Sequence, residues 1–479
     1  MKMPLAIAVA LLMSVLINQA AQPIQLHPDN PHYFLWRGKP TLLITSGEHY
    51  GAVMNLDFDY VPYLDELKTH RFNLTRVFSG AYREVPGSFH IVGNTQAPAQ
   101  GRFVCPWARS STAGASDGGN KFDLALWDET YFRRLEDFVA QAGQRGVVVE
   151  FVFFCTMYNE TFWNVSPMNV RNNVNDIGRV SRNEVYGAKE RPLLDAQRAM
   201  ARKVVAALNR FDNVYFEVCN EPHERDGVTE EWNNSIIDAV AETEATLPNR
   251  HLIAQGFANP ATAAGVDRRV SVLNFHYATP ETVRRTYALN RVVAFDETGG
   301  SDRSDRRYRT QGWEFILAGG GVFDHLDFSF TPEHEDGAAV PLPEGTPGGG
   351  GPELRRQLRI LKDFIEGFDF VRMKPDDTTV KSHVITVRRQ PTIAASRGPA
   401  KATVQVLSET GKAYAIYING GSQAELVLQL PTRRYKVEWL NTKTGLVEKA
   451  EIFEHKGGTR TVHSPAYADD IALRVNRID

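Results

Sequence analysis

Short apolar runs alternate with amphipathic stretches through most of the chain, and this pattern changes near residue 376. Several runs are continuously apolar, which is typical of strands that are covered on both faces. Stretches with helical periodicity separate them, at 59–70, 130–145, 193–210 and 230–246. The pattern predicts strands at 42–45, 74–78, 147–154, 214–219, 252–255, 272–276, 292–295 and 322–328.

Eight strands that alternate with helices favour an α/β fold of the TIM-barrel class, a closed (β/α)₈ barrel. A breaker-rich segment at 345–351 precedes an amphipathic helix at 353–364 that would close the barrel. A doubly wound open sheet is the alternative, but no Gly-x-Gly-x-x-Gly follows the first strand.

The last hundred residues have a different pattern, with alternating or apolar runs separated by turn signals. This predicts a small antiparallel β-sandwich, with strands at 384–387, 402–407, 413–418, 424–430, 435–440 and 471–475. We therefore expect three parts: a signal peptide at 1–22, a barrel at 23–375 and a β-sandwich at 376–479.

The first 22 residues read as a secretory signal, because Lys2 precedes an apolar core and small residues follow at Ala20 and Ala21. We expect a secreted or periplasmic protein that has no membrane attachment after cleavage; an uncleaved anchor is the alternative. The net charge of −3 favours neither nucleic acid nor an anionic membrane as a partner. The three cysteines, Cys105, Cys155 and Cys219, imply no disulfide framework.

Two of the expected strands end in a glutamate, Glu221 after the fourth and Glu297 after the seventh. A carboxylate at the exit of a buried strand is costly unless it is used or partnered. Strands four and seven lie nearly opposite each other in an eight-strand ring, so the two acids can face each other across a sugar. One would then protonate the leaving oxygen, which calls for a raised pKa, and the other would attack the anomeric carbon.

Four short motifs at strand ends resemble the clan A glycoside hydrolases, the (β/α)₈ enzymes typified by family five. They are Arg71–Val77, Asn220-Glu221-Pro222, Asn274–Tyr277 and the strand that ends in Glu297. The resemblance implies that Glu221 is the acid/base, that Glu297 is the nucleophile and that Arg76 braces it. Asn220, His276 and Tyr277 would then bind substrate. The opening Asn30–Phe34 and the sandwich resemble hydrolases that join such a barrel to a domain labelled collagen-binding, a label not carried over as a function.

Further candidates lie close to these motifs. His49 follows the first strand and is a candidate for sugar contact. His325 and Asp327 stand where the family's eighth strand carries a tryptophan, and they could bind hydroxyls instead. Asp296 should point away from Glu297 by strand alternation, and Glu217, on the face of Glu221, should have a partner such as Arg76. Long loops at 81–128 and 156–190 are expected to be functional.

The sequence thus predicts an O-glycosyl hydrolase that cleaves β-glycosidic bonds in an oligo- or polysaccharide with retention. Its mechanism needs no cofactor or metal, and the acidic run at 333–336 is expected to be a solvated loop. A carbohydrate-binding barrel without turnover and an inverting hydrolase stay open as alternatives. The sequence does not indicate which sugar is cut, whether cleavage is internal or terminal, or the oligomeric state.

Overall fold

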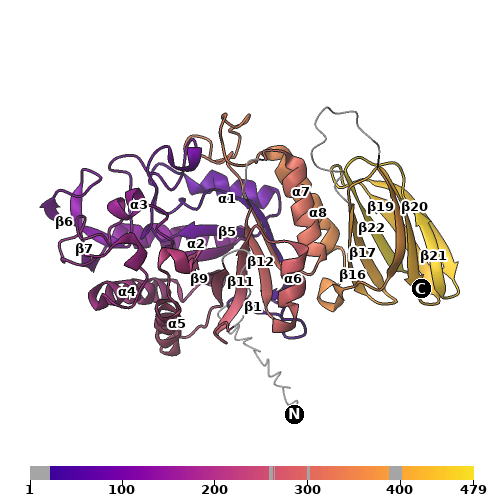
Figure 1. The fold of residues 1–479 in the computed structure, drawn as a ribbon, viewed down its shortest axis with the longest axis horizontal. Helices are drawn as coiled ribbons and strands as arrows, with labels where there is room; N and C mark the ends of the chain where they lie inside the picture. The colour runs from indigo at the N-terminus through magenta and orange to yellow at the C-terminus, as the bar shows by residue number, and fades with distance from the viewer. Residues whose placement is uncertain (1–21, 258–262, 264, 299–301, 388–401, 479) are drawn as a thin grey trace, which may run out of the picture.

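The computed structural model describes residues 22–257, 263, 265–298, 302–387 and 402–478, and a parallel barrel forms its larger part (Figure 1). Within these residues, eight parallel strands hydrogen-bond in the order β4-β13-β12-β11-β10-β9-β8-β5. The expected TIM-barrel fold is therefore confirmed. The strands are β4 (Leu43–Gly47), β5 (Leu74–Phe78), β8 (Val148–Cys155), β9 (Val214–Asn220), β10 (Ile253–Phe257), β11 (Val270–His276), β12 (Val292–Glu297) and β13 (Val322–Leu326).

A side chain closes the ring between β4 and β5, which have no ladder between them. The amide of Asn73 accepts from the backbone N–H of Ile44 at 3.0 Å and donates to the carbonyl of Leu42 at 2.9 Å. An asparagine can make both bonds because its side chain carries a donor and an acceptor, as a peptide group does.

The helices lie outside the ring, and their apolar faces pack against it. The carboxylate of Asp128 caps α2 by accepting from the backbone N–H groups of Thr130 and Tyr131, which satisfies two donors left free at a helix start. Phe138 and Val139 on the same helix are fully buried. The helices are α1 (Tyr60–Thr69), α2 (Glu129–Gln144), α4 (Arg191–Leu208), α5 (Glu230–Ala245), α6 (Pro280–Thr286), α7 (Asp305–Leu317) and α8 (Pro352–Glu366).

The interior of the barrel changes character along its axis. At the amino ends of the strands an apolar layer includes Leu43, Leu74 and Val148, and Phe34 and Trp36 of a small N-terminal sheet pack onto it. That sheet consists of β1 (Gln25–Leu26), β2 (Phe34–Trp36) and β3 (Lys39–Thr41). Polar side chains fill the barrel above this layer, so its chemistry lies toward the carboxyl ends.

The two long loops that follow β5 and β8 contain structure of their own. The first holds a hairpin of β6 (Trp107–Ala113) and β7 (Asn120–Trp127), and the second holds a short helix, α3 (Glu160–Val165). Trp107 and Trp163 are buried, so these aromatics pin the loops to the barrel.

Two antiparallel sheets form the C-terminal part and face each other across a separate apolar core. Helices α7 and α8 lie between them and the barrel (Figure 1). Trp313 of α7 stacks on Tyr417, and the Arg309 guanidinium forms a buried ion pair with Asp470. The strands are β14 (Lys374–Pro375), β15 (Val380–Thr386), β16 (Thr403–Glu409), β17 (Ala413–Asn419), β18 (Gln423–Leu430), β19 (Arg433–Leu440), β20 (Val447–His455), β21 (Gly458–His463) and β22 (Asp470–Arg477).

The expected signal peptide falls almost entirely on residues 1–21, which lie outside the described part of the chain. Among the residues that are described, no helix has the length and apolar character needed to cross a membrane.

Candidate active site

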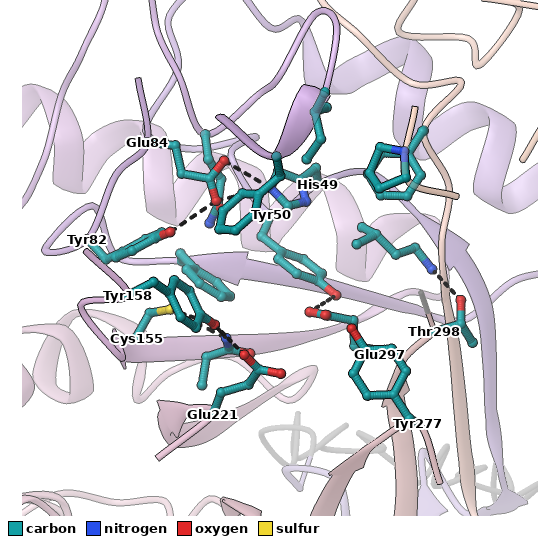
Figure 2. A pocket seen from close by; sticks show the side chains of 18 residues that line it. His49, Tyr50, Tyr82, Glu84, Cys155, Tyr158, Glu221, Tyr277, Glu297 and Thr298 are labelled. Atoms are coloured by element: carbon teal, nitrogen blue, oxygen red, sulfur yellow. Dashed lines mark hydrogen bonds and ion pairs between the residues drawn. The ribbon is translucent and has the colours of Figure 1, made fainter. Parts of the chain in front are cut away.

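A cavity of about 180 Å³ lies at the carboxyl ends of the barrel strands, and both candidate glutamates form part of its wall (Figure 2). Strand ends and the loops after them supply its lining. The lining residues are His49, Tyr50, Phe78, Tyr82, Glu84, Phe89, Ile91, Gln96, Cys155, Tyr158, Asn220, Glu221, Tyr277, Glu297, Thr298, Leu326, Phe328 and Pro347.

The two glutamates meet across this cavity. Glu221 directly follows β9, where the backbone turns with a φ of 46°, and Glu297 is the last residue of β12. One carboxylate oxygen of each lies within 4.8 Å of the other, and a ring nitrogen of His276 lies within the same distance of both. The side chains keep 20% and 15% of their surface exposed, so both acids are open to a ligand.

Three partners surround the Glu297 carboxylate. The Tyr50 hydroxyl donates to its carboxylate at 3.0 Å. The Arg76 guanidinium lies 3.8 Å away and the His276 imidazole 3.5 Å away. A carboxylate whose position is fixed by a hydroxyl donor and two cationic side chains is suited to act as a nucleophile.

Glu221 is held by the Tyr158 hydroxyl at 2.6 Å and by Nδ1 of His276 at 2.9 Å. Burial raises the pKa of Glu221, but the hydrogen bond and charge of His276 outweigh burial and lower that pKa to about 2. Burial lowers the pKa of His276, whereas the charges of Glu297 and Asp296 raise it further, to about 10. The pair therefore shares one proton that resides on the imidazole, which differs from the raised Glu221 pKa expected from the sequence.

Arg76 organises the layer beneath the cavity. Its guanidinium donates to Glu217 at 3.0 and 2.5 Å and to the amide oxygen of Asn220 at 2.8 Å. The expected pairing of Glu217 with Arg76 is therefore confirmed. Arg76 also lies 4.8 Å from the ring centre of Tyr50, which makes a cation–π contact.

Asp296 lies inside the barrel, which corrects the expectation from strand alternation. On β11, Phe275 and His276 pair with Phe295 and Glu297 of β12, so β12 carries one extra residue between them. Such a bulge breaks the alternation of side chains. Asp296 is fully buried, with its carboxylate 3.4 Å from Arg76 and 3.8 Å from Nε2 of His276.

A third carboxylate in the cavity wall was missed by sequence reasoning. Glu84, on the long loop after β5, accepts from Nε2 of His49 at 3.3 Å, from the Tyr82 hydroxyl at 3.1 Å and from Asn94 at 2.5 Å. His49 thus lines the cavity, oriented by Glu84 (Figure 2), and its expected contact with sugar stays a prediction. The length of that loop was the available signal, but it did not single out Glu84.

His325 and Asp327 do not line the cavity, so the geometry gives no support to their expected contact with sugar. Nδ1 of His325 bonds the Thr298 hydroxyl at 2.7 Å, and burial lowers the pKa of His325 to about 4. Asp327 accepts from Arg355 at 2.8 Å and from Ser46 at 2.8 Å. Both side chains are buried and tie β13 to its surroundings.

Two groups in the described part of the chain have ligand atoms close enough together to hold a metal ion. The first is Glu221, His276 and Glu297, and the second is Glu150, Glu217 and Asp296. In the first, the His276 nitrogen already bonds Glu221. In the second, the Arg76 guanidinium lies among the carboxylates and supplies positive charge there. The acid-pair chemistry of the cavity needs neither group to bind a metal.

Residues 102–295 match the family model described as cellulase (glycosyl hydrolase family 5). No curated protein sequence matches the chain. Among solved structures, the chain is similar to one described as a glycoside hydrolase, with a TM-score of 0.63 and 13% identity over 95% of this chain and 97% of the other. It is also similar to a glycoside hydrolase family 5 structure from Bacteroides vulgatus ATCC 8482, with a TM-score of 0.62 and 13% identity over 95% and 92%.

At these identities the structural likeness concerns the fold alone, which extends over nearly the whole chain. The family match bears on the chemistry, because it runs from β6 into β12 and includes Glu221; it ends at residue 295, just before Glu297. The expected resemblance to the clan A glycoside hydrolases is therefore confirmed, and the chain is an O-glycosyl hydrolase.

Proposed function

We propose that this enzyme is a secreted retaining hydrolase of β-glycosidic bonds in oligo- or polysaccharides, with Glu297 as nucleophile and Glu221 as acid/base. The observation that carries the proposal is the approach of their carboxylate oxygens to within 4.8 Å across one cavity. Double displacement needs carboxyl groups about 5–5.5 Å apart, whereas inversion needs about 6.5–9.5 Å to admit a water.

In the first step, the Glu297 carboxylate attacks the anomeric carbon while Glu221 protonates the leaving oxygen. A covalent glycosyl–enzyme forms, and the sugar beyond the cleaved bond departs. In the second step, Glu221 takes a proton from water, and the water oxygen displaces Glu297. Tyr50 and Arg76 hold the Glu297 carboxylate in place throughout.

His276 supplies the proton that Glu221 needs in this scheme. In the free site the proton resides on the imidazole, whose Nδ1 lies 2.9 Å from the Glu221 oxygen. When a glycosidic oxygen arrives beside Glu221, the proton moves from Nδ1 to the carboxylate and on to the leaving group. One proton on the pair is therefore enough for the acid step.

Azide tests the two roles separately. Glu297→Ala should abolish hydrolysis with little change in Tm, and azide should then displace the leaving group once, which gives an α-glycosyl azide from a β-linked substrate. Glu221→Ala should accumulate the glycosyl–enzyme from a substrate with a good leaving group, and azide should attack it to give a β-glycosyl azide.

The matched control is Glu84→Ala, which removes the third carboxylate of the cavity and should yield no azide product. Proton NMR of the first sugar released by the wild type should show the β-anomer. Release of the α-anomer would favour the inverting mechanism, and unchanged turnover in Glu297→Ala would refute the nucleophile assignment. Binding of oligosaccharides without any release of reducing sugar would favour a barrel that only binds.

Export is supported by the N-terminal sequence, a lysine followed by an apolar core and small residues. Expression of the full chain should deliver a protein that begins near residue 23 to the periplasm or the medium, which N-terminal sequencing would verify. Retention of residues 1–22 in a membrane fraction would favour the anchor instead.

A further inference from the structure

Two aromatic side chains stand out by their exposure. Among the aromatic residues that the structure describes, Phe89 and Tyr277 alone keep more than two fifths of their surface exposed, at 45% and 42%. Both line the catalytic cavity. Both also have a left-handed backbone, with φ of 54° and 53°, which bulky residues rarely adopt. Strain of this kind persists only where the surrounding structure fixes the backbone, and it clusters at active sites and ligand-binding positions.

The two rings lie on different sides of the acid pair. The backbone N–H of Tyr277 donates to the carbonyl of Glu297, so Tyr277 adjoins the nucleophile. The ring of Phe89 packs edge-on against Tyr158, with ring centres 5.8 Å apart, and the Tyr158 hydroxyl donates to Glu221. Phe89 therefore stands on the side of the acid/base.

Packing alone does not account for Phe89. Its loop is already anchored by neighbours such as Tyr82 and Ile91, which are buried. The ring packs against Tyr158 and Phe162, and the residue still keeps 45% of its surface exposed where it lines the cavity. A phenyl face open at that place can cover the apolar C–H face of a pyranose ring, which removes apolar surface of both from water.

We propose that Phe89 is a specificity-determining residue that stacks on the sugar released when Glu221 protonates the glycosidic oxygen. The enzyme then selects substrates that carry a sugar, rather than a small group, on the leaving side of the bond. This inference rests on the proposed function, because it takes Glu221 as the acid.

The test compares two substrates that share a glycone and differ in the leaving group. One is the β-1,4-linked tetrasaccharide of glucose, mannose or xylose with the highest wild-type kcat/KM. The other is the β-glycosyl fluoride of the same glycone that the enzyme cleaves from that tetrasaccharide. Its fluoride leaving group is too small to reach Phe89. Phe89→Leu keeps an apolar side chain against Tyr158 but has no flat face.

Phe89→Leu should lower kcat/KM about tenfold for the tetrasaccharide and leave the fluoride unchanged. Phe89→Tyr should keep the wild-type ratio of kcat/KM for the tetrasaccharide to kcat/KM for the fluoride, because it keeps the aromatic ring. Val92→Ala, a change at an exposed residue of the same loop that does not line the cavity, should alter neither value. An equal loss on both substrates, or no loss on either, would overturn the proposal.

Failure of the proposed function gives a different result. Full activity of Glu297→Ala on both substrates would refute the acid-pair mechanism. The ratio of kcat/KM for the tetrasaccharide to kcat/KM for the fluoride, compared between Phe89→Leu and the wild type, would still test the stacking contact. If the wild type cleaves neither substrate, calorimetric titration with the three tetrasaccharides decides the stacking contact. Affinity about tenfold weaker in Phe89→Leu would support it, and equal affinity would overturn it.

Discussion

Two groups of carboxylates lie at different depths in the barrel, and they differ in what stabilises them. Glu221 and Glu297 at the strand ends are partly exposed and have His276 between them. The deeper group is sealed from solvent, and the Arg76 guanidinium lies among its carboxylates. Its members are Glu150, Glu217, Asp296 and Asp324.

Burial raises the pKa of carboxylates in both groups, but the net pKa shift differs between them. For two members of the deep group burial dominates: it raises the pKa of Glu150 to about 8, and that of Asp324 well above its ordinary value. At the cavity, the His276 charge and hydrogen bond overcome burial, so Glu221 is ionised. A carboxylate in a barrel is thus not a catalytic signal by itself; access to a ligand and a proton on a neighbouring imidazole distinguish the pair that we propose to be catalytic.

Loss of the cation in the deep group should have the largest effect on stability. Arg76→Met removes the guanidinium that lies against Glu217 and Asp296, which leaves buried charge uncompensated. We expect a loss of about 3–5 kcal/mol in the free energy of unfolding, measured by urea titration.

The control is Arg71→Met, since Arg71 is half exposed and forms ion pairs with Asp363 and Glu366 at the surface. Its cost should stay within about 1 kcal/mol. Equal costs for the two variants would show that the deep acids are neutralised without Arg76.

Strand pattern was enough to predict the barrel and the acid pair, because apolar runs mark buried strands and an acid at a strand exit is rare without use. It failed where geometry departs from the pattern. The extra residue in β12 turned Asp296 inward, and no sequence signal marks that bulge. Tyr50 and Tyr158 reach the acids from loops, and Glu84 reaches the cavity wall from another; the paths of loops depend on tertiary packing.

A second prediction concerns the pH dependence of stability. Burial raises the pKa of Glu150 from its ordinary value of 4.5 to about 8. The folded state therefore holds a proton that the unfolded chain releases, and stability falls as pH rises from about 4.5 to about 8. Glu150→Gln mimics the protonated acid and should reduce that fall, with a gain of about 1–4 kcal/mol over the wild type at pH 8.

Urea titrations at pH 5, 6, 7 and 8 would measure this difference. Glu129→Gln at an exposed position should keep the wild-type slope. If Glu150→Gln and the wild type lose stability in parallel, Glu150 is ionised inside the barrel. Both oxygens of Glu150 accept hydrogen bonds, from Tyr215 at 2.8 Å and from Asn274 at 2.5 Å, so an ionised form would still have partners.

The smallest expected effect lies where the two groups meet, at Asp296 and His276. The imidazole faces the carboxylates of Glu221, Glu297 and Asp296, and Arg76 lies beyond Asp296. Burial raises the pKa of Asp296 to about 6, so Asp296 is negative at alkaline pH and helps His276 to keep its proton. Asp296→Asn removes that charge. The alkaline limb of kcat/KM, set by loss of the proton from the Glu221–His276 pair, should therefore move to lower pH.

The control separates this electrostatic effect from a structural one. Glu150→Gln changes the same deep group but does not face His276, so its stability profile should change while its alkaline limb stays in place. A purely structural role for Asp296 would lower kcat/KM at every pH without moving the limb. A shift in Asp296→Asn with none in Glu150→Gln would mean that one deep carboxylate serves the reaction, although it never touches the sugar.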